Sequence, residues 1–378
     1  MMELEVEGTM LKDFVAAEVV LSLDSLSRSF SFEATSETPG ELPFKQDQSV
    51  RAFVDGDLVA TGTIEVLNVS GSAAEHSISI QGRDKTGAIG DSTLGNIPDI
   101  TATVTLKSIC ENVLKHLGFP TDENDPEHIA VIDNLQLEPF NSAEDQISPD
   151  LAQNAFDYME IWARKRQVLL SSDADGNLLF RQPSAGTAVF PKDVFLQHLL
   201  NNNSNNVMTY STSYDSTGRF NRYIVTAQGN PTLFAISGLR EVADLVDQTG
   251  RAVLDANVRV GRQLVLTAET NGSPEQNTAR AEWESNIRKF KGQTYQCTVS
   301  GFRNQKGNLW QPGDLVFVND SYANIKAQMR INNVIFSVGL DSGATTQMTL
   351  LEPTVYTLSL ETPKENEVGE ALTEEGDE

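Results

Sequence analysis

Apolar and polar residues alternate in several short runs at the start of the chain. Leu4 and Val6 stand between glutamates, and Phe30 and Phe32 stand among serines and a glutamate. A period of two places successive side chains on opposite faces of a strand. Residues 1–82 are therefore predicted to form a set of half-buried strands.

One part of this stretch carries a hairpin signal. Asp55-Gly56-Asp57 separates residues 50–54 from residues 58–66, and both flanking runs are rich in strand-forming residues. Ile78 and Ile80 repeat the alternation and close the set. Several short strands at this spacing favour a small barrel or sandwich.

A first helix is predicted over residues 106–117. Thr105 is placed to cap its start, and Gly118 is placed to end it. The apolar stripe comprises Leu106, Ile109, Cys110, Val113, Leu114 and Leu117. This spacing follows the helical period of about 3.6 residues, so the stripe is expected to pack on a core.

A second helix is predicted to open at Pro149 and Asp150, after an acidic, loop-like stretch over residues 120–148. Its expected core face comprises Leu151, Ala155, Tyr158 and Trp162. The basic run Arg164–Arg166 suits the negative C-terminal end of a helix.

Residues 173–177 (Asp-Ala-Asp-Gly-Asn) stand between two strand-like runs, 168–171 and 178–180. The spacing resembles the start of a calcium loop, but an EF-hand requires Gly at the sixth position and Glu at the twelfth. Those positions are Leu178 and Ser184 here. We therefore predict a strand, a turn and a second strand.

A third helix is predicted after Ser273, which is placed as its N-cap, with Pro274 at the first helical position and Gln276 completing a capping box. Its expected core face comprises Ala279, Trp283, Ile287 and Phe290.

Strand-like runs return at residues 210–228 and from Tyr295 to Tyr356. The chain thus has two β-rich regions with helix-containing segments between them. We expect these regions to superpose as like domains, which suits a pseudo-symmetric assembly, although their sequence similarity is too weak to establish a repeat. A single continuous sheet would contradict this expectation.

Composition sets the scale of the protein. The 378 residues suggest two to four domains, and 39% hydrophobic residues suffice for real cores. The formal net charge of -25 argues against nucleic-acid binding and against anionic membranes. Residues 361–378 hold eight acids and one lysine. That segment is expected to be a solvated end or, alternatively, a docking strip for a partner.

Cysteine usage and the N-terminal residues add two exclusions. Cys110 and Cys297 lie far apart, so buried free thiols are expected and no disulfide framework. The first residues show no basic and apolar export signal, and no apolar run approaches the roughly 20 residues of a membrane span. Synthesis in the cytoplasm without stable membrane insertion is expected.

The usual signatures of catalysis and metal binding are missing from the sequence. His76, His116, His128 and His198 lack metal-ligand spacing with one another or with cysteine. There is no nucleophile elbow and no Walker-type phosphate loop. We predict no catalytic residue, no metal and no cofactor. A carboxylate pair of the glycosidase type stays open, because its two acids need no fixed spacing in the chain.

The three tryptophans offer a second glycan hypothesis, a sugar-binding platform. Trp162 and Trp283 fall on apolar helix faces, where core packing is the better interpretation. Trp310 follows a turn at residues 307–309 and is expected to anchor a loop or an interface.

Four segments together resemble the baseplate hub proteins of Mu-like contractile-tailed phages. They are residues 82–87 (Gly-Arg-Asp-Lys-Thr-Gly), 155–166 with 172–180, 219–223 with 228–229, and 281–288 with 301–303 and 309–313. Their order and spacing cover about residues 1–356. The resemblance extends over so much of the chain that the type member of the family is a candidate for its identity.

The resemblance implies a β-rich α+β fold with two tube-like β-barrel domains and helix-containing peripheral domains. The first tube-like domain is expected at residues 1–89. The peripheral domains are expected at 90–206 with 236–294. The second tube-like domain is expected to be discontinuous, at 207–235 with 295–356, and an acidic tail to follow at 357–378.

The resemblance also implies a structural role. Such hubs are homotrimers that join a trimeric tail spike to the hexameric tail tube, contact other baseplate proteins and leave a channel for DNA. Expected features are a late protein, host cytoplasm during assembly and then the virion tail baseplate, with no specific nucleic-acid binding. A type VI secretion spike-like protein and a glycan-binding or glycan-hydrolysing β protein are the alternatives.

Overall fold

The computed structural model describes residues 1–35, 44–72, 76–95, 104–137, 139–140, 150, 152–166, 168–182, 194–200, 203–226, 250–267, 274–340 and 342–353. Of these described residues 47% lie in strands and 16% in helices, which confirms a β-rich fold that also contains helices. The described strands form no closed barrel. The barrel form of each tube-like domain therefore stays a prediction.

The first β half consists of seven strands. They are β1 (Met2–Val6), β2 (Thr9–Leu11), β3 (Ala16–Ser22), β4 (Ser29–Thr35), β5 (Ser49–Val54), β6 (Asp57–Gly71) and β7 (His76–Asp84). The predicted hairpin is confirmed, since Asp55 and Gly56 take positive φ values of 50° and 84° between β5 and β6. Both residue types accept the left-handed conformation that a tight hairpin turn requires.

The second β half is assembled from separate parts of the chain. Its strands are β11 (Phe195–His198), β12 (Val207–Tyr214), β16 (Gln293–Ser300), β17 (Leu315–Asp320), β18 (Ile325–Gly339) and β19 (Gly343–Leu351). Strand β12 pairs with β16, so residues far apart in the chain meet in this half, while its boundaries as a domain stay a prediction. Strand β11, expected in the peripheral part of the chain, pairs with β17.

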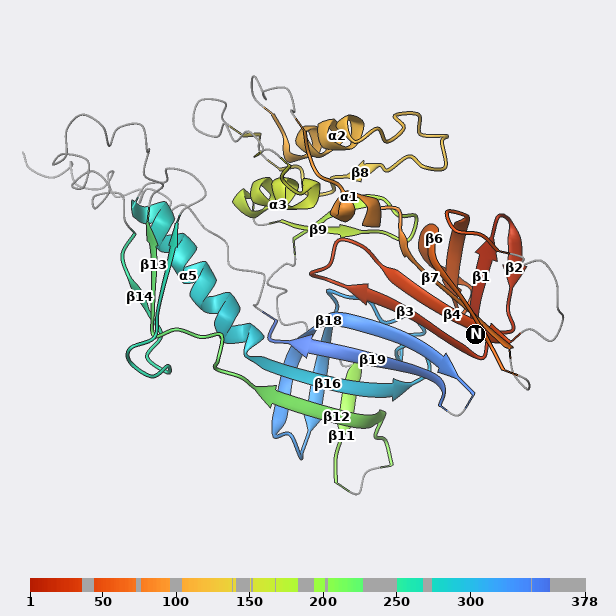
Figure 1. Cartoon of the computed structure of the whole chain (residues 1–378). Helices are drawn as coiled ribbons and strands as arrows, with labels where there is room; N and C mark the ends of the chain where they lie inside the picture. The colour runs from red at the N-terminus through yellow and green to blue at the C-terminus, as the bar shows by residue number, and fades with distance from the viewer. Residues whose placement is uncertain are drawn as a thin grey trace, which may run out of the picture.

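The two β halves form one sheet, so the expectation of two separate domains is wrong in this respect. Thirteen strands are connected, and the joint is an antiparallel pair between β18 and β3 (Figure 1). The pairing runs from Asn333 opposite Ser22 to Gly339 opposite Ala16. We call this strand pair the internal joint.

Within that single sheet the two halves have the same strand order. The first half reads β3-β4-β7-β6-β5, and the second reads β12-β16-β19-β18-β17. In each half a 15-residue strand, β6 or β18, is followed by a nine-residue strand. Each long strand has a shift in its pairing register, which marks a β-bulge. The shift lies between Ile64 and Val66 in β6 and between Ile331 and Asn333 in β18. Equivalent positions in the two halves can therefore be identified from the bulges.

A common core joins the halves. Leu4, Phe32, Val334 and Phe336 are all fully buried in it. Their neighbours along each strand are more exposed, so the period-two pattern seen in the sequence is confirmed.

A lobe built on two helices follows the first β half, and we call it the α2–α3 lobe. Its elements are α1 (Gly87–Asp91), α2 (Leu106–His116), β8 (Val131–Ile132), α3 (Ala155–Lys165), β9 (Leu169–Ser172) and β10 (Leu178–Arg181). The predicted cap of α2 is confirmed, because the Thr105 side chain accepts from the Ser108 backbone amide. The predicted start of α3 is wrong. Asn154 caps that helix, since its side chain accepts from the amides of Phe156 and Asp157.

The α5 lobe comprises β13 (Arg222–Thr226), β14 (Val253–Leu254), β15 (Gln263–Thr267) and α5 (Pro274–Lys291). Residues 222–226, expected in the second tube-like domain, pair with β14 and β15 instead. The expected start of α5 at Pro274 is confirmed, whereas Ser273 and the side chains of Gln276 and Phe290 lie outside the described residues.

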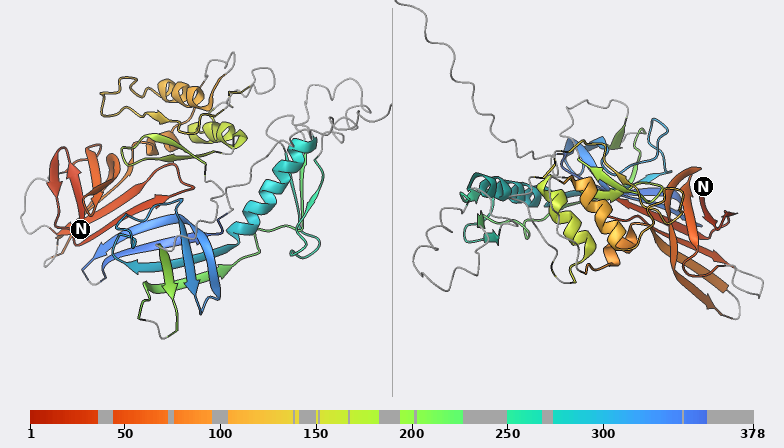
Figure 2. Two further views of the ribbon diagram at one scale, coloured as in Figure 1. Left: turned by 180° about the vertical axis from the view of Figure 1, so that it is seen from behind. Right: turned by 90° about the horizontal axis from the view of Figure 1, so that it is seen from above.

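The predicted core face of α5 is wrong. The helix packs on β13 through Ala281, which is fully buried with Tyr223 and Val225. Small side chains at the contact let the helix lie close to the strands, so the larger Trp283 and Ile287 point elsewhere and line a cleft. The α5 lobe lies at one end of the molecule and the first β half at the other, with the α2–α3 lobe between them (Figure 2).

Candidate assembly surface

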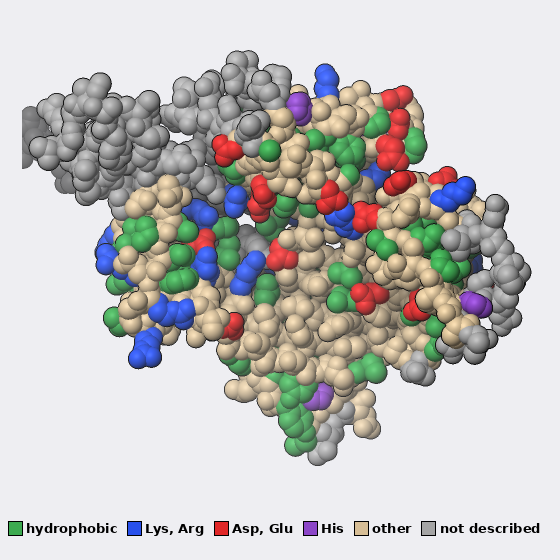
Figure 3. Space-filling model, in the orientation of Figure 1, with side chains coloured by type: hydrophobic (Ala, Val, Ile, Leu, Met, Phe, Trp, Pro, Cys, Tyr) green, Lys and Arg blue, Asp and Glu red, His purple; other side chains and the backbone are tan. Residues whose placement is uncertain are grey.

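Eight strands, in the order β12, β16, β19, β18, β3, β4, β7 and β6, share one outward face, which we call the polar face. One row of directly opposed residues across it reads Ser300, Thr345, Ser337, Glu18, Ser31 and Gln81. The outward positions of β16 are Thr294, Gln296, Thr298 and Ser300. Hydroxyl and amide groups therefore dominate this face of the sheet, and few charges lie over β16, β18 and β19 (Figure 3).

The charges on the polar face are mostly negative. Glu18 and Glu33 are exposed there. Arg83 of β7 is a cationic side chain on this face, and it pairs with Asp91 and with Glu65 at 2.8 Å. Hydrogen bonds from Arg83 to Asp91 and then to Glu65 raise its pKa above the ordinary value. A polyanion near this face would meet carboxylates and neutral groups rather than free cations.

Among the described strands, both ends of the polar face are open edges. At one end, β12 pairs with β16 alone. At the other, β6 pairs with β5 only up to Thr63, so residues 66–71 pair with β7 alone. Unpaired backbone groups along such edges are ready to accept another strand.

The same two edges carry exposed apolar side chains. On β6, Val66 is 41% and Val69 is 55% exposed. On β12, the exposed fractions are 58% for Met208, 36% for Tyr210 and 65% for Tyr214. Large apolar side chains on an open strand edge favour a contact surface over one that stays exposed to solvent.

A buried carboxylate supports β12 from below. Asp320 of β17 accepts hydrogen bonds from the Tyr295 hydroxyl at 2.8 Å and from the Tyr322 and Ala323 amides. Burial and then the hydrogen bond to Asp320 raise the pKa of Tyr295. The His198 ring lies 4.9 Å from Tyr210, and its Nδ1 atom is 3.3 Å from Asp320. The network fixes the aromatic groups beside the open edge.

A second buried network attaches the α2–α3 lobe to the sheet. Asp84 Oδ2 accepts from the Arg28 backbone amide and from the Ser172 hydroxyl, and Asp84 Oδ1 accepts from the Thr86 hydroxyl at 2.6 Å. Arg28 donates to the Val59 and Ser172 carbonyls. Burial raises the pKa of Asp84 and lowers that of Arg28 to about 10. The motif singled out at residues 82–87 is thus a structural junction.

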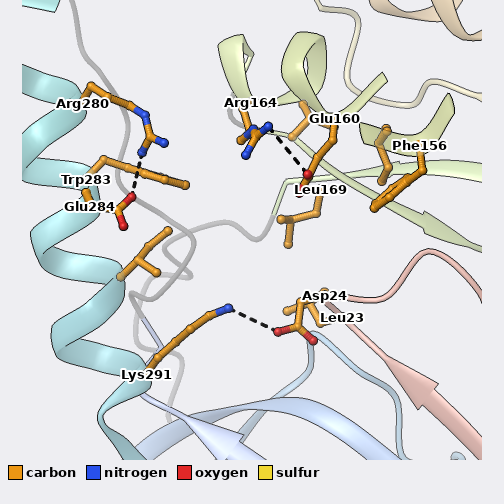
Figure 4. Close-up of a pocket in the computed structure, with 13 residues that line it drawn as sticks. Leu23, Asp24, Phe156, Glu160, Arg164, Leu169, Arg280, Trp283, Glu284 and Lys291 are labelled. Atoms are coloured by element: carbon orange, nitrogen blue, oxygen red, sulfur yellow. Dashed lines mark hydrogen bonds and ion pairs between the residues drawn. The ribbon is translucent and has the colours of Figure 1, made fainter. Parts of the chain in front are cut away.

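A cleft of about 300 Å³ separates α5 from α3 and β9. Trp283 lies on the α5 wall, with the Arg280 guanidinium 4.3 Å above its ring (Figure 4). Lys291 reaches across the cleft floor to Asp24 at 3.4 Å. Burial favours a higher pKa for Asp24, but Lys291 and hydrogen bonds from Ser22 and Asn332 outweigh it and lower the pKa. Its charges are largely paired, so the cleft resembles a packing gap more than a catalytic pocket.

The flagged cysteines are where the sequence indicated. Cys110 on α2 and Cys297 on β16 are both buried free thiols. Burial raises the pKa of both, that of Cys297 to about 12. Neither is a thiolate at neutral pH, and a nucleophilic role would need the thiolate.

The histidines are dispersed, and His198 alone takes part in the assembly surface. His76 and His116 are exposed, and His128 Nδ1 lies 2.8 Å from the Pro120 carbonyl. Within the described residues no three of the His, Cys, Asp and Glu side chains gather as a metal site.

The tryptophans do not form a sugar platform. Trp162 is buried on α3, as expected. Trp310, expected at a loop or an interface, is also buried, in the common core. Trp283 lines the cleft and is not in the core. The Asp173 turn is confirmed, because Asp173 Oδ1 accepts from the amides of Asp175 and Asn177.

Sequence reasoning missed three features of this surface: the internal joint, the two open edges and the buried Arg28–Asp84 network. The first two arise from strand pairing between distant parts of the chain. The third could have been suspected from an aspartate in a strand that is otherwise half apolar. Of the described helices, none is both long and apolar enough to cross a bilayer.

Family models match both β halves. Residues 1–84 match the N-terminal domain of Mu phage baseplate assembly protein GpP-like proteins. Residues 273–359 match the fourth domain of the Mu phage baseplate assembly protein GpP. The matches fall on the two regions that share a strand order.

A curated relative covers nearly the whole chain. The baseplate hub protein gp44 of Escherichia phage Mu is 22% identical over 373 residues, which cover 97% of this chain and 91% of that protein. At this identity the chain is a relative of the type member, and the expectation that it is the type member itself is wrong.

Solved structures share the fold along its length. The 43 kDa tail protein of prophage MuSo2 from Shewanella oneidensis has a TM-score of 0.74 at 24% identity, covering 94% of this chain and 98% of that one. The tail protein from Neisseria meningitidis MC58 has a TM-score of 0.75 at 17% identity, covering 94% and 97%. The strand arrangement described above is therefore found in tail proteins.

Proposed function

We propose that this chain, which belongs to the family of Mu-like phage baseplate hub proteins, closes into a homotrimeric ring around a channel. Its role in a phage baseplate is structural. The observation that carries the proposal is the internal joint between β18 and β3. The equivalent strands in the other halves are β6 and β12, and each of these has an edge with no described partner.

The equivalences follow from the bulges. Val69 lies three residues beyond Val66 on β6, as Phe336 lies three residues beyond Asn333 on β18. On the other side, β12 holds the place in the second half that β3 holds in the first. If one copy repeats the internal joint with the next, the free part of β6 pairs with the neighbour's β12.

The register of this contact can be stated. Phe336 lies opposite Val19 in the internal joint. In the first half Val19 pairs with Phe30, which pairs with Gly82. In the second half Thr212 pairs with Tyr295, which pairs with Leu350. Because Gly82 and Leu350 hold equivalent positions just before the bulges, Thr212 is the β12 counterpart of Val19. The proposal therefore places Val69 opposite Thr212 of the neighbouring copy. The exposed apolar side chains of both edges become buried there, which favours association.

The ring contains three copies because each copy supplies two like halves. A tail tube with six subunits per ring meets six such halves, which three chains provide. Closed cyclic symmetry also leaves no open edge, so strand addition stops. The resemblance that suggests a hexameric tube above and a trimeric spike below fits this count.

The polar face lines the channel in this arrangement. Its serine, threonine and amide side chains form no strong attachment to a phosphate backbone, and Glu18 and Glu33 repel it. DNA can then pass without being held. No catalytic step is part of the proposal, and the partners are the tail spike, the tail tube and other baseplate proteins.

The remaining expectations fit the same proposal. Residues 1–89 form the first tube-like domain, and the second gains β11 and loses β13 to the α5 lobe. The assembled protein resides in the virion tail, after synthesis as a late protein in the host cytoplasm. Residues 357–378 stay an acidic segment outside the described residues.

A disulfide across the inferred contact tests the register. Cysteines at Val69 and Thr212 should link neighbouring copies under oxidation, giving a covalent trimer on a denaturing gel, because directly opposed residues have Cβ atoms about 4.5–5.5 Å apart. Cysteines at Val69 and Tyr214 form the matched control, one diagonal step out of register, and should link far less. Equal linking by both pairs, or a protein that sediments as a monomer at micromolar concentration, contradicts the proposal.

A further inference from the structure

The α5 lobe differs from the rest of the chain in charge. With its connecting segments it spans residues 215–291, and the described residues of this range hold nine Lys and Arg against five Asp and Glu, a net +4. All of residues 215–291 together hold ten Lys and Arg and nine Asp and Glu, whereas the rest of the chain holds 18 Lys and Arg and 44 Asp and Glu. One lobe of a strongly acidic protein is therefore close to neutral overall and basic on its described surface.

Part of that excess lies on a sheet face that α5 does not cover. Tyr223 and Val225 of β13 point toward α5, so Arg222 and Ile224 point the other way. Arg222 lies opposite Leu254 of β14, and Ile224 lies opposite Val265 of β15. Leu254 is 68% and Val265 is 52% exposed. The outer face of this small sheet is thus apolar at its centre.

The turn that leads into β15 adds two exposed residues next to this sheet. Arg259 is exposed there, and Val260 is 85% exposed. We call Arg222, Leu254, Arg259, Val260 and Val265 the outer patch. Within the described residues neither of its arginines has an ion-pair partner, whereas three other arginines of the same lobe do: Arg219 pairs with Asp255, and Arg280 and Arg288 pair with Glu284. Exposed unpaired guanidinium groups beside apolar side chains suit a partner with carboxylates.

The chain itself carries a segment of that chemistry. Residues 361–378 hold eight acids and one lysine, and residues 355–360 include Val355, Tyr356, Leu358 and Leu360. An apolar stretch followed by dense carboxylates complements a patch that combines valine and leucine with arginine.

The described chain ends within reach of the lobe. Leu351 packs with Leu23 and Leu169, which also line the cleft whose far wall is α5. Pro353 accepts a hydrogen bond from Arg330 at 3.1 Å. Seven residues separate Pro353 from Glu361 and can span roughly 23 Å when extended. The 18-residue helix α5 is about 27 Å long. The acidic segment can therefore reach the α5 lobe without strain.

We propose that the outer patch binds the acidic segment at residues 361–378, in the same or a neighbouring copy. The contact is electrostatic with an apolar centre, and it neutralises the exposed arginines that no described carboxylate meets. It goes beyond the ring proposal and does not depend on it, since neither open edge of the polar face takes part.

The test uses a chain that ends at Leu360 and a fluorescent peptide of residues 361–378. The peptide should bind, and raising the salt concentration from about 50 to 300 mM should weaken binding by about tenfold or more, as expected for exposed charges. Changing both patch arginines, Arg222→Glu with Arg259→Glu, should weaken it by at least as much. Lys107→Glu with Lys115→Glu on α2 is the control with the same charge change, and should bind as the unchanged chain does.

A second peptide removes any dependence on the folding of variants. Replacing each acid by its amide should abolish binding to the unchanged protein. Absence of binding, equal binding of both peptides, or binding that survives the patch changes overturns the proposal. So does a short DNA duplex that competes for the patch more strongly than the peptide, because the surface would then be a phosphate site. Sedimentation of the same samples reports on the ring separately.

Discussion

Phe336 of β18 lies directly opposite Val19 of β3, and both side chains are fully buried. Phe336 also packs edge-on against Phe302, with ring centroids 5.7 Å apart. The pair connects two halves of the sheet that are more than 300 residues apart in sequence. Interactions that join the halves therefore contribute to the stability of the entire fold.

Phe336→Ala should lower the free energy of unfolding by about 3–5 kcal/mol, because it removes a large buried side chain and leaves a cavity. Ile335→Ala is the matched control, since Ile335 points to the polar face and is only half-buried. It should cost less than half as much. Denaturant unfolding followed by fluorescence measures both, and equal losses would mean that the internal joint is not specially important.

The strands were predictable because burial of one face leaves a period-two record in the sequence. Leu4 and Phe32 show it, and so do their exposed neighbours. What that record omits is the partner. Asn333–Gly339 has the pattern of a half-buried strand whether it pairs with β3, pairs with another copy or has an edge exposed to solvent. The same limit explains why β13 was placed in the wrong sheet.

Helix faces were predictable only where large residues mark them. The stripe of α2 and its cap at Thr105 are confirmed. In α5 the buried face is formed by Ala281 and Ser285, whose side chains carry little hydrophobic signal. Trp283, which dominates the sequence pattern, lies at the cleft. The candidate surface depends on which strands pair and which helix face is buried. The sequence therefore indicated the family of the protein but not the open edges of β6 and β12.

Lysine at Val69 should prevent ring formation. The inferred contact buries Val69 against the neighbour's β12, and an unpaired charge there costs several kcal/mol. Val69→Lys should therefore shift the protein to monomers at micromolar concentration in sedimentation. Val265→Lys is matched in chemistry and nearly in exposure, 52% against 55%, but it lies in the outer patch. That variant should keep the oligomer of the unchanged chain, and loss of the oligomer in both variants would remove the case for this edge.

Asp84→Asn should destabilise the protein by about 2–4 kcal/mol at neutral pH. The four hydrogen bonds that Asp84 accepts come from donors, and an amide would present its own N–H groups to some of them. It would also leave Arg28 buried without its nearest carboxylate. Thermal and denaturant unfolding measure the loss. Ser79→Ala on the polar face of the same strand β7 should have little effect.

The same variant has a defined dependence on pH. Burial raises the folded-state pKa of Asp84 above its ordinary value of 3.8, so the folded state holds this proton at pH values where the unfolded state has released it. The contribution of Asp84 to stability is therefore greatest below 3.8 and falls as pH rises through the window up to the raised pKa. The stability difference between the unchanged protein and Asp84→Asn should shrink in that window. A difference that grows with pH would mean that Asp84 is held ionised in the fold.

Changing Glu18 and Glu33 to lysine should convert the channel into a DNA-binding surface. Both carboxylates are exposed on the polar face, and each copy gains a charge of +4 from the two changes. Three copies in a ring concentrate that gain on one lining, where a duplex meets lysines on every side. The variant should bind DNA at low salt and release it steeply as salt rises. Glu111→Lys with Glu160→Lys carries the same charge change on α2 and α3, outside the inferred channel. A shift assay in which both variants bind alike would show that net charge is responsible, and the polar face would then not be the wall along which DNA passes.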